Sequence, residues 1–268
     1  MSRAQGLLLA AGCAFLYLPV AVLALFAFND SALMVFPLKG LTLHWFGVLG
    51  RNTLFQEGFV TSLLIAQPVG VASAGLGLVA ALAATGRAFR GRRLFIAMLL
   101  VPFLVPKTVL SVAQAILMSR VGLPRGYLAL AAAETLVILP FTTAMIAAVL
   151  MRIDPRLDEA ARDLGASPWQ SFRLVLLPQL KGVLGAAYSV GVVLSLAELT
   201  ITQFLSGRVQ PLSLIVASQF RRELTPDLNA VQVVVLALTL MLVVVTETWR
   251  RRNLRRAATP AGRTPEAA

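Results

Sequence analysis

Residues 151–179 read MRIDPRLDEAARDLGASPWQSFRLVLLPQ and separate two long apolar runs of the chain. The segment is too polar to cross a bilayer, yet it is patterned as two short helices. Asp154 followed by Pro155 favours a helix start, with an aspartate N-cap and proline at the first helical position. Gly165 favours the end of that helix, as a glycine C-cap does. The segment therefore predicts a helix–turn–helix hairpin between two apolar spans.

Each helix of this hairpin has its own sequence signature. The first carries an apolar stripe at i, i+3, i+4 and i+7 spacing, made of Leu157, Ala160, Ala161 and Leu164. The second begins at Ser167, because Ser167 and Gln170 stand at capping-box spacing around Pro168. We expect it to run to Leu177 and to be closed by Pro178. Small residues allow another surface to come close, which favours a docking element over a plain interfacial hairpin.

The composition around the hairpin is that of a membrane protein. The 268 residues are 58% hydrophobic and 13% charged, whereas soluble domains are about 45–50% apolar and about 25% charged. The net charge of +12 comes from basic residues between apolar runs, which indicates cytoplasmic loops and argues against nucleic-acid binding. Cys13 and His44 are single, and no cluster has metal-ligand spacing. We therefore expect no disulfide, metal or cofactor.

Six stretches reach the roughly 20 mostly apolar residues that a membrane helix needs. They are Leu7–Phe28, Phe59–Thr85, Leu94–Met118, Tyr127–Leu150, Gly182–Leu205 and Leu228–Trp249. The first continues well past Cys13, so we expect a retained helix rather than a cleaved signal peptide. The predicted fold is an all-α membrane protein of six transmembrane helices, with the hairpin between helices 4 and 5. Residues 1–256 would form one domain, with a disordered tail at 257–268.

The basic residues also predict the orientation of the chain. If both termini are cytoplasmic, the inner segments hold more than twice as many Lys and Arg residues as the outer ones. The hairpin then lies in the cytoplasm. Two long outer segments, 29–58 and 206–227, could receive an extracytoplasmic partner or simply cap the helix ends.

Polar residues inside the spans are candidates for a translocation path, because a charge at bilayer depth costs about 2.5–3.5 kcal/mol or more. Glu198 and Thr202 are four residues apart and so predicted on one helix face, with Ser195 nearby. This face could line the path, or Glu198 could pair inside the bundle. Glu134 in the fourth span has the same two alternatives.

Lys107 in the third span follows two prolines. Pro102 and Pro106 should kink or break the helix and turn backbone carbonyls toward a cavity. Lys107 could contact a solute, or it could pair with Glu198 or Glu134.

The hairpin resembles the EAA loop of ABC importer permeases, whose pattern is E-A-A, three residues, G, nine residues, I, one residue, L-P. Every spacing is kept by Glu159-Ala160-Ala161, Gly165, Val175, Leu177 and Pro178, with valine for isoleucine. In that family the loop forms a coupling helix. The resemblance implies that Glu159, Ala160, Ala161, Gly165 and Pro178 dock on an ATPase.

The resemblance extends over nearly the whole chain. The segments that are similar to the spermidine/putrescine permease family, in its second-permease branch, are 29–31, 87–93, 159–169, 194–202 and 221–229. It implies a type I importer fold in a bacterial inner membrane, multi-pass, carrying polyamines. The implied partners are ATP-binding cassette ATPase subunits, a second homologous permease and a periplasmic solute-binding protein.

Three features bear on activity and cargo. The Gly86–Arg93 segment lacks the Gly-Lys-Ser/Thr end of a phosphate loop, so we expect a non-enzymatic chain driven by a separate ATPase. The family usually has two acids at positions 197 and 198 and an acid at position 107. Here they are Ala197, Glu198 and Lys107, so a phosphonate or another small zwitterion or anion is an alternative cargo. A membrane docking protein without transport is a second functional class.

Overall fold

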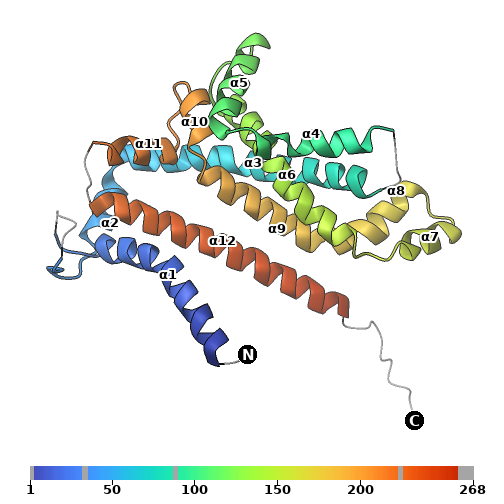
Figure 1. Ribbon diagram of the computed structural model, residues 1–268, viewed down its shortest axis with the longest axis horizontal. Helices are drawn as coiled ribbons and strands as arrows, with labels where there is room; N and C mark the ends of the chain where they lie inside the picture. Colours follow the sequence, from blue (N-terminus) through green and yellow to red (C-terminus); the bar gives the residue numbers. More distant parts are fainter. Residues whose placement is uncertain (1–2, 32–35, 87–89, 223–225, 259–268) are drawn as a thin grey trace. The chain divides into compact units, whose positions relative to one another are not determined.

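The computed structural model describes residues 3–31, 36–86, 90–222 and 226–258. In these ranges all regular elements are helical, and the extended backbone pairs only at an isolated Asn29–Leu41 bridge. The elements in chain order are α1 (Arg3–Ala27), α2 (His44–Arg51), α3 (Thr53–Thr85), α4 (Arg92–Leu104), α5 (Lys107–Arg120), α6 (Tyr127–Leu150), α7 (Arg156–Asp163), α8 (Pro168–Ser171), the π-helical turn η1 (Phe172–Leu176), α9 (Leu177–Leu196), α10 (Thr200–Leu205), α11 (Leu212–Phe220) and α12 (Pro226–Ala258) (Figure 1).

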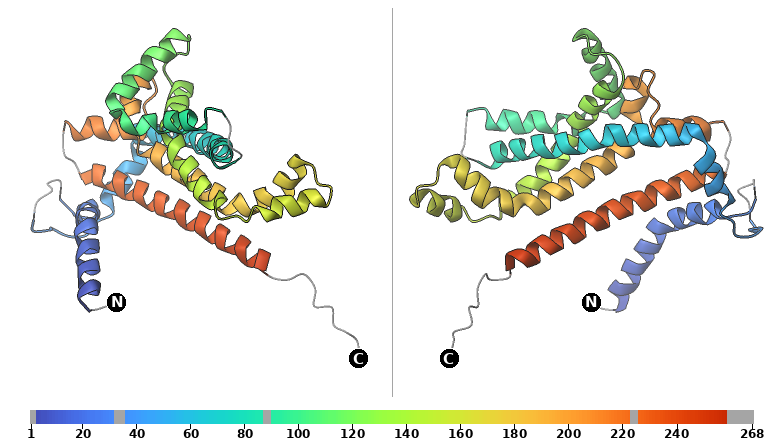
Figure 2. Two further views of the ribbon diagram at one scale, coloured as in Figure 1. Left: turned by 45° about the vertical axis from the view of Figure 1, so that its right-hand side comes forward. Right: turned by 180° about the vertical axis from the view of Figure 1, so that it is seen from behind.

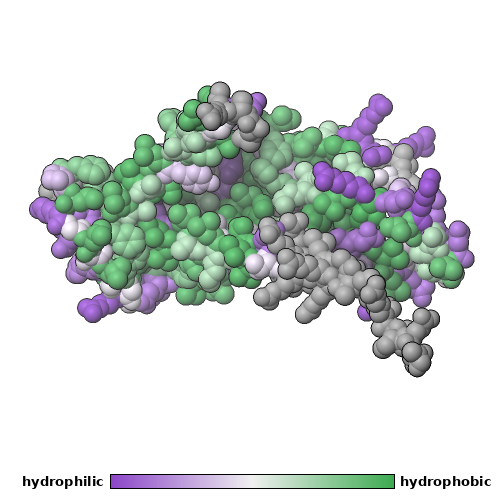
Figure 3. Space-filling view, turned by 90° about the horizontal axis from the view of Figure 1, so that it is seen from below, coloured by the Kyte–Doolittle hydropathy of each residue, from purple (hydrophilic) through white to green (hydrophobic). Residues whose placement is uncertain are grey.

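Several of the described helices have the length and composition of membrane spans. Five qualify singly, namely Gln5–Ala27, Thr53–Thr85, Tyr127–Leu150, Pro168–Leu196 and Pro226–Thr248, and the bent pair α4–α5 makes a sixth if it counts as one span. Hydrophobic side chains cover most of the described surface on the face in Figure 3, as expected for helices that face lipid. The predicted class, an all-α membrane protein with about six spans, is confirmed.

Two predicted spans are broken. The third is interrupted at Val105–Pro106, where α4 and α5 meet at 112°, as the paired prolines predict. The prediction of one continuous helix over Gly182–Leu205 is wrong. Here α9 ends at Leu196 and α10 begins at Thr200, and the three residues between them are not helical. The fourth predicted span, Tyr127–Leu150, matches α6 at both ends.

The described residues form two compact units. One contains residues up to 61 and 210–240, and its core includes Phe55, Ile215 and Leu228. The other contains residues 62–209 and those from 241 onward. In this second unit α6 packs against α9 (Figure 2). The single domain over 1–256 stays a prediction. Of the predicted tail, residues 259–268 lie outside the described residues.

Small residues bring α3 and α9 into close contact in the second unit. A Cβ atom placed on Gly191 would lie 2.5 Å from Ser73 Oγ and 3.0 Å from the Cα atom of Gly70. Such close approach of two backbones is how membrane helices gain packing contacts that lipid cannot supply.

We expect Gly191→Leu to destabilise the detergent-solubilised protein by about 1–3 kcal/mol or more, since the Gly70 backbone cannot move aside for a side chain. Thermal unfolding would measure this. Gly75→Leu is the matched control, because Gly75 lies in α3 and a Cβ there meets nothing within 4 Å. Equal unfolding temperatures for the two variants would contradict the packing account.

Candidate functional site

The first helix of the hairpin is capped at both ends by its own residues. Asp154 Oδ1 accepts a hydrogen bond from the Arg156 N–H at 3.0 Å, and α7 begins there, one residue later than predicted. At the other end Gly165 has a φ of +88°. The Gly165 N–H donates to Arg162 O at 2.8 Å and the Ala166 N–H donates to Ala161 O at 3.0 Å. This is the Schellman arrangement, which confirms the predicted glycine C-cap.

The second helix begins as predicted but does not end as predicted. Ser167 and Gln170 form a reciprocal capping box. Pro178, however, does not close the helix, because the helical segment continues from Pro168 to Leu196. The π-turn η1 lies just before the proline, and the Leu177 N–H donates five residues back to Phe172 O. This wider winding lets the chain pass a residue that has no N–H to donate.

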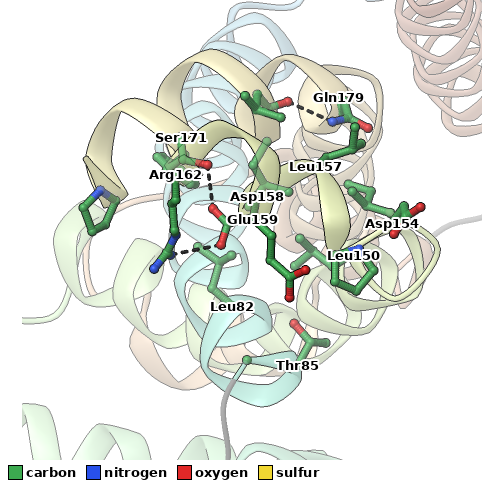
Figure 4. Close-up of a pocket in the computed structure, with 17 residues that line it drawn as sticks. Leu82, Thr85, Leu150, Asp154, Leu157, Asp158, Glu159, Arg162, Ser171 and Gln179 are labelled. Carbon is green, nitrogen blue, oxygen red and sulfur yellow. Dashed lines mark hydrogen bonds and ion pairs between the residues drawn. The ribbon is translucent and has the colours of Figure 1, made fainter. Parts of the chain in front are cut away.

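Asp158 ties the two helices of the hairpin together. Its Oδ1 accepts from the buried hydroxyl of Ser171 at 2.5 Å, and its Oδ2 pairs with Arg162 at 3.0 Å (Figure 4). Sequence reasoning did not single out this contact. The i, i+4 spacing of Asp158 and Arg162 was its only visible signal.

A cavity of about 580 Å³ lies between the hairpin and the adjoining ends of α3 and α6. Glu159 lines it, and its carboxylate points to the side where Thr85 lies (Figure 4). Ala160, Ala161 and Gly165 are not among its lining residues. The residues expected to dock are therefore divided, with Glu159 on the cavity and the small residues elsewhere on the hairpin.

Much of the apolar stripe of the hairpin is exposed in the part of the chain that the structure describes, although Leu157 also lines the cavity and Ala161 is half-buried. No residue of α7 is buried. Leu164 is 90% exposed, Trp169 65% and Leu157 44%. Trp169 contacts Phe172 in a stacked pair, so the second helix of the hairpin also presents an exposed aromatic side chain. A rigid, capped hairpin thus presents hydrophobic side chains outward.

Replacing Asp158 by alanine should loosen α7 without unfolding the rest. The variant loses two charge-assisted hydrogen bonds, together about 1–3 kcal/mol after allowance for their exposure. Hydrogen exchange of α7 amides should accelerate about tenfold or more, as read by mass spectrometry on peptides covering 154–166. Asp163→Ala, in the same helix, is the control and should exchange at the native rate. Unchanged exchange in Asp158→Ala would show that the caps alone hold the helix.

A second polar cluster lies at the break between α9 and α10. Glu198 is only 7% exposed, and its Oε2 pairs with Lys107 Nζ at 2.7 Å. Its Oε1 accepts from the N–H groups of Thr200 and Ile201 at 2.9 and 3.2 Å. The carboxylate therefore joins the start of α5 to the start of α10. Of the alternatives open for Lys107, the structure has the pair with Glu198.

The predicted helix face of Glu198, Thr202 and Ser195 is not formed, because Ser195 lies in α9, Glu198 in the non-helical break and Thr202 in α10. The Thr202 hydroxyl instead donates to the Glu198 carbonyl at 2.8 Å, which satisfies a backbone acceptor beside the break. The Ser195 hydroxyl donates to Glu134 Oε2, and both residues are buried. The five predicted path residues thus form two groups, and both carboxylates have partners.

Comparison with known proteins gives a consistent match. The family model for "Binding-protein-dependent transport system inner membrane component" matches residues 73–258. The chain is 29% identical over 241 residues to the spermidine/putrescine transport system permease protein PotC of Haemophilus influenzae, covering 90% of this chain and 93% of the relative. It is 31% identical over 234 residues to the putrescine transport system permease protein PotI of Escherichia coli K12, covering 84% and 83%.

Two further matches widen the range of relatives. The sulfate transport system permease protein CysT of Escherichia coli K12 is 29% identical over 221 residues, which cover 76% of this chain and 80% of the relative. A chain in the crystal structure of a bacterial alginate ABC transporter, in complex with an alginate pentasaccharide-bound periplasmic protein, superposes with a TM-score of 0.70 at 17% identity. That superposition covers 93% of this chain and 94% of the other, and it shows a shared fold.

Proposed function

This chain belongs to the family of binding-protein-dependent transport system inner membrane components, and from that premise we propose that an ATPase docks on the hairpin 151–179 and drives transport through it. The chain is a multi-pass membrane protein and a permease subunit of an ABC importer. Under this proposal separate ATPase subunits hydrolyse ATP, and this chain moves in response.

The observation that carries the proposal is the exposed apolar surface of the hairpin. A helix with no buried residue, followed by a Leu164 side chain that is 90% exposed, leaves hydrophobic surface in water unless a partner covers it. The two caps and the Asp158 contact fix the shape of the stripe in advance, which lowers the entropy lost on binding. Glu159, Ala160, Ala161 and Gly165 would enter a groove of the ATPase, and Pro178 would lie where the hairpin joins α9.

The remaining partners follow from the same family. We place both termini and the hairpin in the cytoplasm, with a second homologous permease completing the path across the membrane. A periplasmic solute-binding protein would deliver the solute to the outer side. Closure of the ATPase pair on ATP would move both hairpins together and rock the bundles between inward-open and outward-open states.

Polyamines are the first candidate cargo, because PotC and PotI are named for spermidine and putrescine. The path would include Lys107, Glu134, Ser195, Glu198 and Thr202. Under this candidate the two carboxylates would have to exchange their present partners for the ammonium groups of the solute.

A small anion or zwitterion, such as a phosphonate, is the second candidate, and the ion pair favours it. Glu198 is already neutralised by Lys107, and Glu134 accepts from Ser195. The side chain of Lys107 is 54% exposed and has further N–H donors for an anion. The relative CysT, named for sulfate, is consistent with anionic cargo in this family.

The test is uptake by vesicles that contain this chain with its ATPase, its permease partner and its binding protein. We expect ATP-dependent accumulation of one solute class among labelled putrescine, spermidine, sulfate and methylphosphonate. Vesicles with ATPase subunits unable to hydrolyse ATP are the control. ATP-dependent uptake that proceeds equally without this chain would contradict the proposal.

A further inference from the structure

A cavity of about 430 Å³ lies between α5 and α10, in the second compact unit. Its polar lining consists of Ser119, Arg120, Arg125 and Gln203. The remaining lining is apolar and includes Val112 and Phe204. The cavity thus combines two guanidinium groups, an amide and a hydroxyl with a hydrophobic wall.

The charge of this cavity is uniformly positive. No carboxylate lines it, and neither Arg120 nor Arg125 forms an ion pair within the described ranges. From residue 62 to 150 and from 180 to 209 the sequence has two acidic residues, Glu134 and Glu198. Both are buried and hydrogen-bonded within the bundle. The arginines therefore have no counter-charge from this part of the chain.

The backbone around Arg125 is fixed against α10. The Gly126 N–H donates to Leu205 O at 3.0 Å. Gly207 approaches so closely that a Cβ atom there would lie 3.0 Å from Arg125 Cβ. Arg120 ends α5, where a cation is favoured by the helix dipole, but that preference does not account for Arg125. Arg125 is instead held at the cavity by the backbone contacts that Gly126 and Gly207 make.

We propose that this cavity binds an oxyanion of the phosphate, phosphonate or sulfate class. Guanidinium groups match such oxyanions with parallel N–H···O bonds, and Ser119 and Gln203 add neutral donors. This rests on the proposed function in one respect: in the proposed orientation the cavity opens on the outer side, where the solute arrives. The site then selects anionic cargo and disfavours polyamines, because two uncompensated arginines repel ammonium groups.

A lipid phosphate has the same chemistry as a free oxyanion, so the experiment has two arms. The full-length chain is placed in nanodiscs of phosphatidylcholine alone, and equilibrium binding of sulfate, methylphosphonate and spermidine is measured. The same measurement is repeated with phosphatidylglycerol present, and lipids retained by the protein are quantified. We expect saturable binding of sulfate or methylphosphonate in the first arm and none of spermidine.

The Arg120→Gln/Arg125→Gln double variant should weaken that binding at least tenfold. Arg208→Gln is the matched control, since Arg208 is another exposed outer arginine that does not line the cavity, and it should bind as the native chain does. Both arginines are exposed, so the double variant should fold. An Arg120→Lys/Arg125→Lys variant keeps the two charges but loses the paired N–H donors of guanidinium. Its oxyanion affinity should lie between those of the native chain and the double glutamine variant.

The results of this experiment either support or overturn the oxyanion site. Retention of phosphatidylglycerol that depends on both arginines, without free oxyanion binding, would support the site and identify a lipid headgroup as its ligand. Oxyanion binding that is equal in the double variant, or spermidine binding in place of oxyanions, would overturn the site. Absence of both oxyanion binding and arginine-dependent lipid retention would also overturn the site, and it is the result expected if the arginines only contact the acidic surface of a binding protein. Absent ATP-driven uptake, with arginine-dependent binding intact, would overturn the proposed function and leave the site standing.

Discussion

Gly165→Trp should abolish ATP-driven uptake while the subunit still inserts in the membrane. Gly165 has a φ of +88°, where a side chain costs about 1–2 kcal/mol. The larger effect comes from the indole, which would stand beside the exposed Leu164 on the surface proposed to enter the ATPase groove. A Cβ atom at this position meets nothing within 4 Å of its own chain, so the substitution should leave the bundle intact. Vesicle uptake and copurification of the ATPase would measure the loss.

Gly91→Trp is the matched control for this prediction. Gly91 has a φ of +91° and open space around its Cβ position, so it reproduces the backbone strain outside the hairpin. It should transport at a near-native rate, and Gly165→Ala should fall between the two because it adds strain without bulk. Uptake at the native rate by the Gly165→Trp importer would contradict the proposal that the hairpin couples the ATPase to transport.

Glu198→Ala should destabilise the subunit by about 2–3 kcal/mol, the sum of a lost helix cap and a lost half-exposed ion pair, and it should strongly reduce uptake. The substitution removes the partner of Lys107 and also the acceptor of two N–H groups at the start of α10. Loss of such a cap costs about 0.5–2 kcal/mol. The ion pair adds less than a fully buried one, because Lys107 is half exposed to solvent. Thermal unfolding and vesicle uptake would measure the two effects.

Two further variants separate the roles of this carboxylate. Glu198→Gln keeps an oxygen for the N–H groups and should recover most of the stability. Exchange of the two charges, as Lys107→Glu with Glu198→Lys, should not restore the native state, because an ammonium group cannot accept from the start of α10. Full rescue by this exchange would show that the ion pair alone matters.

Much of the helical framework follows from local sequence. Tyr127–Leu150 matches its predicted span because a glycine precedes the run and the polar hairpin follows it. The break before Lys107 and the capping box at Ser167 are local chemistry of proline and serine. The prediction that Pro178 closes the helix is wrong, because a proline ends a helix unless the preceding turn widens. No local residue pattern indicates the π-turn.

The tertiary contacts could not be predicted in the same way. The break at residues 197–199 contains neither glycine nor proline, and its partner Lys107 is 91 residues away. In the sequence Arg120 and Arg125 are only two basic residues between apolar runs, because the cavity forms when Gln203 from a distant helix comes beside them. Their chemistry was visible in the sequence, but their proximity was not.

The π-turn at Phe172–Leu176 has a mechanical consequence. Because it carries the helix past Pro178, one continuous helical segment runs from Pro168 to Leu196, and this segment changes direction at the π-turn (Figure 1, Figure 2). One end of the bent segment bears the exposed hairpin surface, and the other stops two residues before Glu198. The π-turn therefore sets the angle between the hairpin and α9. A displacement of the hairpin by a partner would reach the start of α10 and its carboxylate through this bent lever.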